Sequence, residues 1–358
     1  MPAPRPRPGR SEHTELADRL ERMRVPSPRE IDLRLEALGY RGQREARRAA
    51  CVLAYRHLRR LQRLHVDGIP PSELTGRENF LLVGPTGCGK THLVELLFRE
   101  ILEVPTVVVD ITQFSETGYV GHDVSTILTR LVHAAGGDVG WASCGVVCLD
   151  EFDKLAGSSS NARFAGQETT KDVSGWGVQR SLLTLLGADA AEFAPDYGFS
   201  GRTAPRAIPL SGVTFLACGA FSGLRAGAEL SRPLGFGAAA TEGAPAQQDA
   251  LEVSALDRYG FMPELLGRFT RIVELAPLGE AELRAIVVEH VRRYRRELEA
   301  DGLELVVDAA TTDGLVAEAL RRGVGARGLR AALTRLVEDL VYERAGADGR
   351  EALELPWR

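Results

Sequence analysis

The stretch that most constrains the fold of this chain lies at residues 79–93 and reads NFLLVGPTGCGKTHL. Its apolar first part is typical of a buried strand, and it leads directly into the pattern G-x-x-x-x-G-K-T. Apolar residues at helical spacing follow. A strand, a glycine-rich loop and a helix in this order are the setting of a P-loop, so the stretch predicts a nucleotide-binding site.

The residue types of the loop explain its spacing. Glycines 84, 87 and 89 let the backbone curl with its N–H groups pointing inward, which forms a cradle for phosphate groups. Lys90 is placed to reach the β- and γ-phosphates, and the Thr91 hydroxyl to bind Mg²⁺. We therefore expect a nucleoside triphosphate with Mg²⁺ as cofactor. The predicted ligands in the loop are Gly84, Pro85, Thr86, Gly87, Cys88, Gly89, Lys90 and Thr91.

A second apolar run, at residues 145–154, reads GVVCLDEFDK and ends in paired carboxylates. This is the Walker B pattern, and it follows the P-loop after one further strand and helix. Asp150 is expected to bind the Mg²⁺ shell, while Glu151 is expected to polarise the water that attacks the γ-phosphate. The pair indicates a site that hydrolyses its nucleotide.

Composition excludes several classes of protein. With 358 residues and 44% apolar content, the chain can bury a large core divided between two or three domains. No apolar run is long enough to span a bilayer, and the start lacks the apolar segment of a signal peptide, so we expect a cytoplasmic protein without membrane contact. The five cysteines form no C-x-x-C pair, which favours reduced, buried thiols over disulfides or zinc.

Patterning along the chain predicts three segments. Residues 1–25 begin with a Pro/Arg-rich run and form a flexible, partly helical arm; residues 26–276 form the large α/β ATPase domain; residues 277–358 form a small helical domain. Within the last segment, helices are predicted near 280–299, 308–321 and 326–344, with a closing strand at 351–355.

A helix predicted from about residue 44 to 64 is rich in arginine. Such a run can bind nucleic acid, but its arginines alternate with apolar residues as in an amphipathic helix. We interpret the basic face as solvated or subunit-facing, and expect no nucleic-acid partner.

Several motifs together resemble the ClpX family of AAA+ protein unfoldases. They are Gly118-Tyr119-Val120-Gly121-His122-Asp123-Val124, Leu149-Asp150-Glu151-Phe152-Asp153-Lys154, Asp172-Val173-Ser174-Gly175-Trp176-Gly177-Val178-Gln179, Cys218-Gly219-Ala220-Phe221 and Gly325-Ala326-Arg327-Gly328-Leu329-Arg330. The resemblance runs from about residue 25 to the end of the chain.

The resemblance implies an AAA+ P-loop α/β fold with a parallel sheet core and a small, mainly helical C-terminal domain. It also implies an ATP-hydrolysing chaperone that assembles as a homo-oligomer, a hexameric ring, and threads unfolded or tagged proteins through the pore. Tyr119 and Val120 match the pore loop that grips the polypeptide. Arg268 matches the arginine finger that completes a neighbour's ATP site, and Arg327 matches the sensor of the γ-phosphate.

A partner is implied by the tripeptide Leu234-Gly235-Phe236, which stands in a long Gly/Ala/Pro-rich stretch. Exposed Leu and Phe side chains in such a loop suit a partner's apolar pocket. In the family, an aliphatic-Gly-Phe tripeptide docks the ring onto the peptidase ClpP. The alternative is a loop that tucks both side chains onto its own domain.

The sequence also departs from the family's pattern. Residues 1–25 contain no cysteine, so we expect neither bound zinc nor zinc-dependent recruitment of substrates. Arg202-Thr203-Ala204 replaces a more basic pore-entrance loop, and the pattern at the second pore loop, residues 161–171, is weak. Trp176 replaces a glutamate, and Arg41 an aliphatic residue expected near adenine. Three alternatives stay open: a remodeller without a peptidase, a nucleic-acid-remodelling ATPase, and a scaffold subunit in a mixed ring.

Overall fold

The computed structural model describes residues 12–114, 123–156, 173–194, 205–222, 256, 259–344 and 352–355. Several predicted features lie outside the described residues. They are the pore-loop pair Tyr119 and Val120, the second pore loop at 161–171, the entrance residues 202–204 and the docking tripeptide Leu234-Gly235-Phe236.

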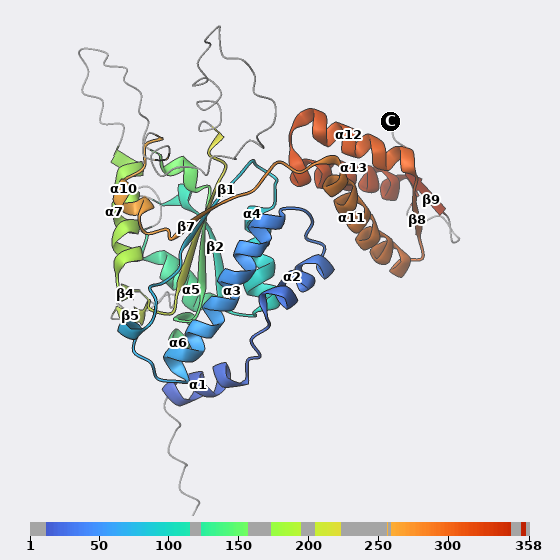
Figure 1. Ribbon diagram of the computed structural model, residues 1–358. Coiled ribbons are helices and arrows are strands. Elements are labelled where there is room, and N and C mark those ends of the chain that lie inside the picture. Colours follow the sequence, from blue (N-terminus) through green and yellow to red (C-terminus); the bar gives the residue numbers. More distant parts are fainter. Residues whose placement is uncertain are drawn as a thin grey trace, which may run out of the picture.

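A five-stranded parallel sheet forms the centre of the fold (Figure 1). Its strand order is β2-β3-β6-β1-β7, so the strand before the P-loop lies between two others. The strands are β1 (Phe80–Val83), β2 (Thr106–Asp110), β3 (Val146–Asp150), β6 (Thr214–Gly219) and β7 (Arg271–Glu274). The predicted parallel α/β core is confirmed.

The side chains of β1 alternate between two hydrophobic clusters because successive residues of a strand point to opposite faces. Phe80 and Leu82 join the cluster on one face, and Leu81 and Val83 the cluster on the other. Helices cover both faces, as a parallel sheet requires. The first cluster includes α1 (Glu12–Arg22), α2 (Pro28–Ala37) and α3 (Arg44–His65), and the second includes α5 (Thr126–Ala134) and α7 (Val173–Gly187).

The helix after the P-loop changes type along its length. It begins as α4 (Lys90–Val94) and continues as the π-helix η2 (Glu95–Ile101), so the helix predicted after the P-loop is α-helical only in its first part. Wider turns of this kind are often found at functional sites, and Glu95, where the change occurs, lines the cavity described below.

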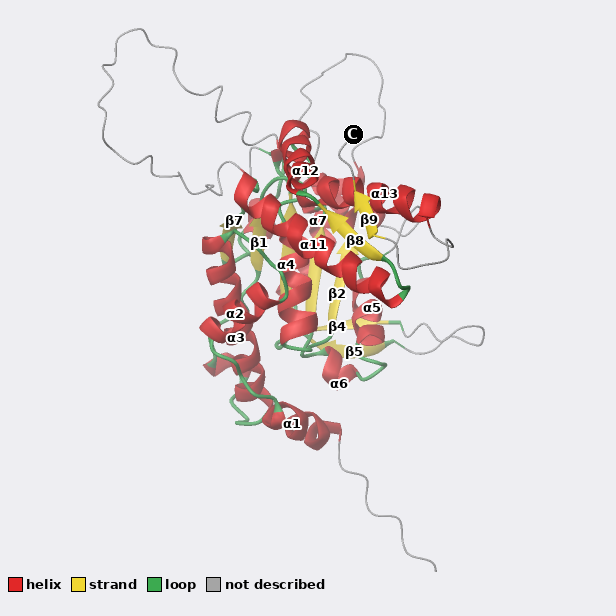
Figure 2. Ribbon diagram, turned by 90° about the vertical axis from the view of Figure 1, so that its right-hand side faces the viewer, coloured by secondary structure: helices red, strands yellow, loops and turns green. Residues whose placement is uncertain are grey.

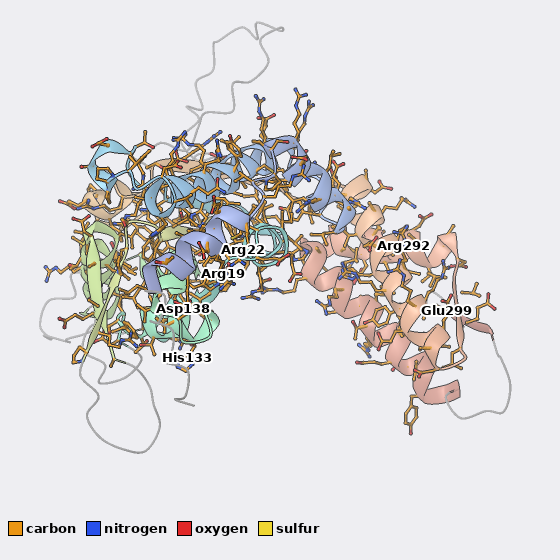
Figure 3. All side chains as sticks on the ribbon, turned by 90° about the horizontal axis from the view of Figure 1, so that it is seen from below. Arg19, Arg22, His133, Asp138, Arg292 and Glu299 are labelled. Atoms are coloured by element: carbon orange, nitrogen blue, oxygen red, sulfur yellow. The ribbon has the colours of Figure 1, made fainter. Side chains whose placement is uncertain are left out.

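The N-terminal helices pack firmly onto the sheet-bearing part. Leu16 and Leu20 of α1 are buried, and the Arg19 guanidinium lies 3.7 Å from the ring centroid of Trp141, near Asp138 (Figure 3). Cation–π contacts of this kind add to apolar burial. Residues 12–22, predicted as part of an arm, thus lie against the short helix α6 (Val139–Ala142).

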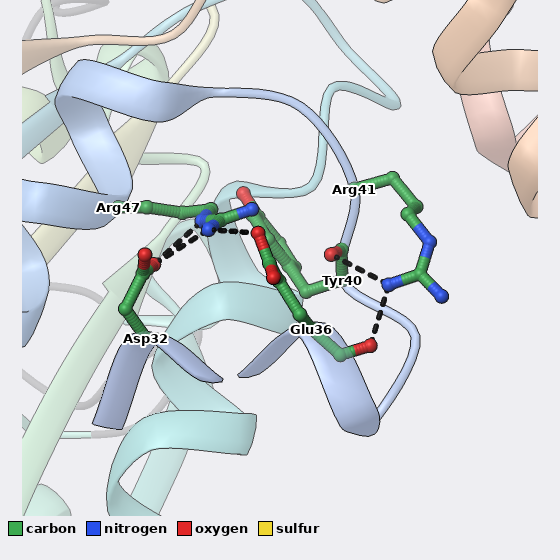
Figure 4. A network of polar contacts seen from close by, with 5 residues as sticks. All are labelled: Asp32, Glu36, Tyr40, Arg41 and Arg47. Carbon is green, nitrogen blue, oxygen red and sulfur yellow. Dashed lines mark hydrogen bonds and ion pairs between the residues drawn. The ribbon is translucent and has the colours of Figure 1, made fainter. Parts of the chain in front are cut away.

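Helices α2 and α3 are joined by a buried arginine. Arg47 of α3 forms ion pairs with Asp32 at 2.7 Å and Glu36 at 2.6 Å (Figure 4). Its side chain is only 10% exposed; burial acts to lower the pKa of the guanidinium, but the contacts with Glu36 and Asp32 outweigh burial and raise it. At least part of the arginine-rich helix therefore supports the fold.

Three C-terminal helices lie together beside the sheet-bearing part (Figure 1). They are α11 (Glu280–Ala300), α12 (Ala309–Arg322) and α13 (Gly325–Arg344), and they enclose their own apolar cluster. The closing strand β9 (Ala352–Leu355) was predicted, but its parallel partner β8 (Glu304–Val307) was not (Figure 2). The hydroxyl of Thr311 donates to the carbonyl of Leu355 at 2.7 Å and fixes this ribbon to α12.

Short elements complete the fold. They are β4 (Ala190–Phe193) paired with β5 (Arg206–Pro209), the short helices α6 (Val139–Ala142) and α10 (Pro263–Leu266), and the 3-10 turns η1 (Pro71–Glu73), η3 (Ile111–Gln113) and η4 (Phe152–Leu155). Among the described helices, none combines the length and the apolar character needed to cross a bilayer. All five cysteines are buried and free.

Candidate functional site

A cavity of about 410 Å³ opens at the carboxyl ends of the central strands, where open parallel sheets bind their ligands. Four parts of the chain line it: the P-loop with α4, the ends of β3 and β6, the loop before α3, and helices α11 and α13. The cavity therefore lies between the sheet and the C-terminal helices.

The P-loop curls at two of its glycines. Gly87 and Gly89 adopt φ angles of 78° and 96°, a left-handed region that side chains disfavour. The Lys90 side chain, 9% exposed, points back into its own loop, and its ammonium donates to the carbonyls of Gly84 at 2.6 Å and Pro85 at 3.0 Å. This position puts a cation at the centre of the phosphate cradle.

Thr91 and Asp150 meet although 59 residues separate them. The Thr91 hydroxyl donates to Asp150 Oδ2 at 2.8 Å, because the sheet places the end of β3 beside the start of α4. Hydroxyl and carboxylate oxygens are the ligands that Mg²⁺ prefers, so the two predicted metal-binding residues fit a nucleotide-bound Mg²⁺.

Glu151 lines the cavity in an unusual backbone conformation. Its φ is 54°, which is rare outside glycine and is often found at functional sites. The Glu151 N–H donates to Asp150 Oδ1 at 2.9 Å, which turns the chain sharply after β3. The buried Asp153 accepts from the N–H of Ala220 at 3.0 Å, so the turn is tied to the end of β6.

The N-terminus of α13 touches the P-loop directly. The Ala326 N–H donates to the carbonyl of Gly87 at 3.0 Å, and a methyl group added at Gly325 would lie 2.7 Å from that carbonyl oxygen. Only two glycines allow the backbones to come this close. The contact places Arg327 on the cavity wall, opposite Asp150 and the P-loop.

Arg268 is the one predicted catalytic residue that does not line the cavity in the same chain. It follows α10 on the surface, and its guanidinium lies over Gly187 at the end of α7. The structure thus brings Lys90, Thr91, Asp150, Glu151 and Arg327 together and leaves Arg268 apart.

Sequence reasoning missed several residues of the cavity wall. Two histidines, His92 of α4 and His290 of α11, line the cavity, as do Arg293 and Arg330. Burial lowers the pKa of both imidazoles, and these two arginines act in the same direction. His92 could have been predicted to line the site because it directly follows Thr91. Arg330 could have been predicted because it lies one helical turn after Arg327.

The loop before α3 closes the remaining side. Arg41 does line the cavity, and its guanidinium is held by the carbonyls of Tyr40 and Glu36 (Figure 4). Next to it, the Gln43 amide donates to the carbonyl of Ala276 at 2.6 Å and accepts from the Ala276 N–H at 2.9 Å. This two-bond contact stands where the chain leaves β7 for the C-terminal helices.

Fold and site define a P-loop ATPase of the AAA class. Residues 76–272 match the family described as AAA domain (Cdc48 subfamily), and residues 278–348 match the C-terminal, D2-small domain, of ClpB protein.

Relatives narrow the assignment. Proteins named ATP-dependent Clp protease ATP-binding subunit ClpX are similar along most of the chain. The one from Treponema denticola is 32% identical over 92% of this chain and 80% of its own length. Those from Borrelia duttonii and Azotobacter vinelandii are 34% and 35% identical, over 89% and 84% of this chain and 75% and 70% of their own lengths. The chain belongs to the ClpX family of AAA+ ATPases.

Proposed function

We propose that this ATPase unfolds proteins and threads them through the pore of a homo-oligomeric ring, a hexamer, and that it delivers them to a ClpP-type peptidase. One observation carries the proposal: the P-loop and the Walker B carboxylates share a cavity whose far wall is α13. A nucleotide bound there would contact both parts of the chain. Its hydrolysis would therefore change how residues 277–358 sit on residues 26–276.

The residues divide the chemistry among them. Lys90 would neutralise charge on the β- and γ-phosphates, and Thr91 and Asp150 would hold a nucleotide-bound Mg²⁺, whose charge would stabilise the phosphate oxygens. Glu151 orients and polarises the attacking water. Arg327 senses the γ-phosphate from α13, and Arg268 of an adjacent subunit completes the site.

Similarity to the family supports the mechanical part. Tyr119 and Val120 grip the polypeptide, and Leu234-Gly235-Phe236 docks on the peptidase. The relatives are named as subunits of a Clp protease, which favours a peptidase partner over the remodeller that works without one. Nothing in this role requires a membrane, and a cytoplasmic location suits it.

A nucleic-acid substrate is disfavoured by the contacts of α3. Arg56 pairs with Glu78 at 2.7 Å, and Arg60 donates to the carbonyl of Ser211 at 3.1 Å. Together with Arg47, these side chains are committed to the protein's own groups. The basic run thus offers fewer uncommitted cations to a phosphate backbone than its sequence indicates.

The test is ATP-dependent unfolding of a stable fluorescent protein that carries an unstructured tail. We expect the wild-type protein to abolish the fluorescence. The Tyr119→Ala variant should hydrolyse ATP at a near-normal rate but unfold the fluorescent protein at least about 10-fold more slowly, because its pore loop no longer grips the substrate. Glu151→Gln is the control, since it should bind ATP without turnover, a loss of about 10²-fold or more for an acid–base group. Undiminished unfolding by Tyr119→Ala would remove the threading mechanism.

A further inference from the structure

The Arg268 guanidinium lies directly over a glycine. Gly187 is the last residue of α7, and a methyl group added there would lie 3.1 Å from Arg268 Nη2 and 3.2 Å from Cζ. Contacts this short are rare, so a larger residue at this position would push the guanidinium away by a few tenths of an ångström. The glycine is exposed and its backbone is helical. The backbone conformation therefore does not by itself require a glycine at position 187.

A second arginine occupies the carbonyl groups at the same helix end. Arg77 Nη2 donates to Leu186 O at 2.6 Å and Ala188 O at 3.1 Å, and Nη1 donates to Leu210 O at 3.0 Å. The carboxyl end of a helix attracts cations, so both guanidinium groups are drawn there. Arg77 therefore occupies the carbonyl acceptors at this helix end. Within the described part of the chain, the Arg268 guanidinium donates no hydrogen bond, which leaves its donors available to a ligand.

The backbone of Arg268 is fixed from the other side by Asn79, which is 3% exposed. Asn79 Nδ2 donates to the carbonyl of Arg268 at 3.0 Å, and Oδ1 accepts from the N–H of Phe215 at 3.1 Å. The Thr270 N–H donates to the carbonyl of Asn79 at 2.8 Å. The side chain and the backbone of Asn79, just before β1, thus tie Arg268 to the starts of β6 and β7.

We propose that Gly187 seats the Arg268 guanidinium, and that Arg77 and Asn79 are positioning residues that hold it ready for the triphosphate bound by a second copy of this chain. The inference rests on the proposed role of Arg268 in completing a neighbour's site. The inference adds an explanation of how the Arg268 guanidinium is held in place while its hydrogen-bond donors stay available. A planar guanidinium with free N–H donors is suited to bidentate contact with phosphate oxygens, provided that it is held in place.

The test is Gly187→Ala in the full-length chain, because alanine suits a helix better than glycine and the variant should fold at least as well. We expect the Tm to stay level or rise slightly. The Kd for a fluorescent ATP analogue should stay within about twofold, because each chain binds its own nucleotide. We expect kcat for ATP to fall roughly 3- to 10-fold, because the guanidinium is pushed aside by less than the 1 Å misplacement that can cost about 10²-fold.

Gly76→Ala is the matched control, because a methyl group at Gly76 would meet nothing within 4 Å. It should keep the wild-type kcat. Arg268→Ala separates the two levels of the argument. If Arg268→Ala keeps full turnover, the proposed role of Arg268 is wrong. If Arg268→Ala loses turnover while Gly187→Ala keeps it at an unchanged Tm, that role stands and the seat at Gly187 is refuted.

Discussion

His57 shows how much of a residue's behaviour the fold decides. It is 3% exposed, and its ring nitrogens lie 2.9 Å from Thr214 Oγ1 and 3.1 Å from the carbonyl oxygen of Cys144. Burial lowers the pKa of this imidazole to about 4. Because the unfolded chain binds a proton near pH 6.5 and the folded chain does not, stability is full above that pH and falls as the pH drops toward 4.

We predict that this histidine alone contributes a slope of up to about 1.4 kcal/mol per pH unit between those two values. Urea unfolding at pH 7.5, 6 and 5 would measure it. His57→Gln should flatten the dependence relative to the wild type, while His133→Gln, at an exposed position, should retain it. Equal slopes in all three proteins would contradict the assignment.

The residues of the site could be predicted from the sequence where a motif determines their type and spacing. Lys90, Thr91, Asp150 and Glu151 follow from spacing, because phosphate and Mg²⁺ restrict which side chains can stand there. The roles of Gln43 and Gly187 could not be predicted from the sequence, because they depend on contacts with Ala276 and Arg268, which are far away along the chain. Only the fold defines such pairs.

At the scale of elements, the junction between the P-loop and α13 depends on backbone shape. Gly325 has a φ of 58° and faces the carbonyl of Gly87, whereas Gly323, with a φ of 62°, ends α12 in open space. Alanine at either position pays the same left-handed strain, about 1–2 kcal/mol. Only alanine at Gly325 also presses on the P-loop.

We predict that Gly325→Ala and Gly323→Ala lower the Tm by similar amounts, but that only Gly325→Ala lowers kcat for ATP, by about 10-fold, because α13 and Arg327 are pushed from the site. Steady-state ATPase assays and thermal unfolding would decide. A similar loss of turnover in both variants would assign the effect to strain alone.

Elements were predictable to the extent that they are periodic and buried. The apolar strands of the P-loop and Walker B stretches and the three C-terminal helices were predicted within a few residues. Strand β8 was missed because Glu304 and Val306 face solvent and only Leu305 is buried among the first three residues, which leaves a weak signal. The π-helical turns of η2 could not be predicted, because their sequence is equally suited to an α-helix.

At the scale of the whole molecule, the proposed docking on a ClpP-type peptidase can be tested directly. We predict that deletion of Leu234 to Phe236 leaves ATP turnover within about twofold of the wild type and abolishes association with a ClpP-type peptidase, because a docking site concentrates its binding energy in a few apolar side chains. Sedimentation of the mixture with ATP would measure this. Full association of the deletion variant with the peptidase would show that docking uses another surface.

The Gln43 amide has a mechanical consequence. Because both polar groups of Ala276 are bonded to it, the chain cannot bend at that residue without breaking two hydrogen bonds. Rotation of the C-terminal helices has to come from residues 277–279, where the ring of Pro277 already fixes one dihedral angle. Such a rotation would be confined to a short segment whose first end is anchored through Gln43, the N-cap residue of α3.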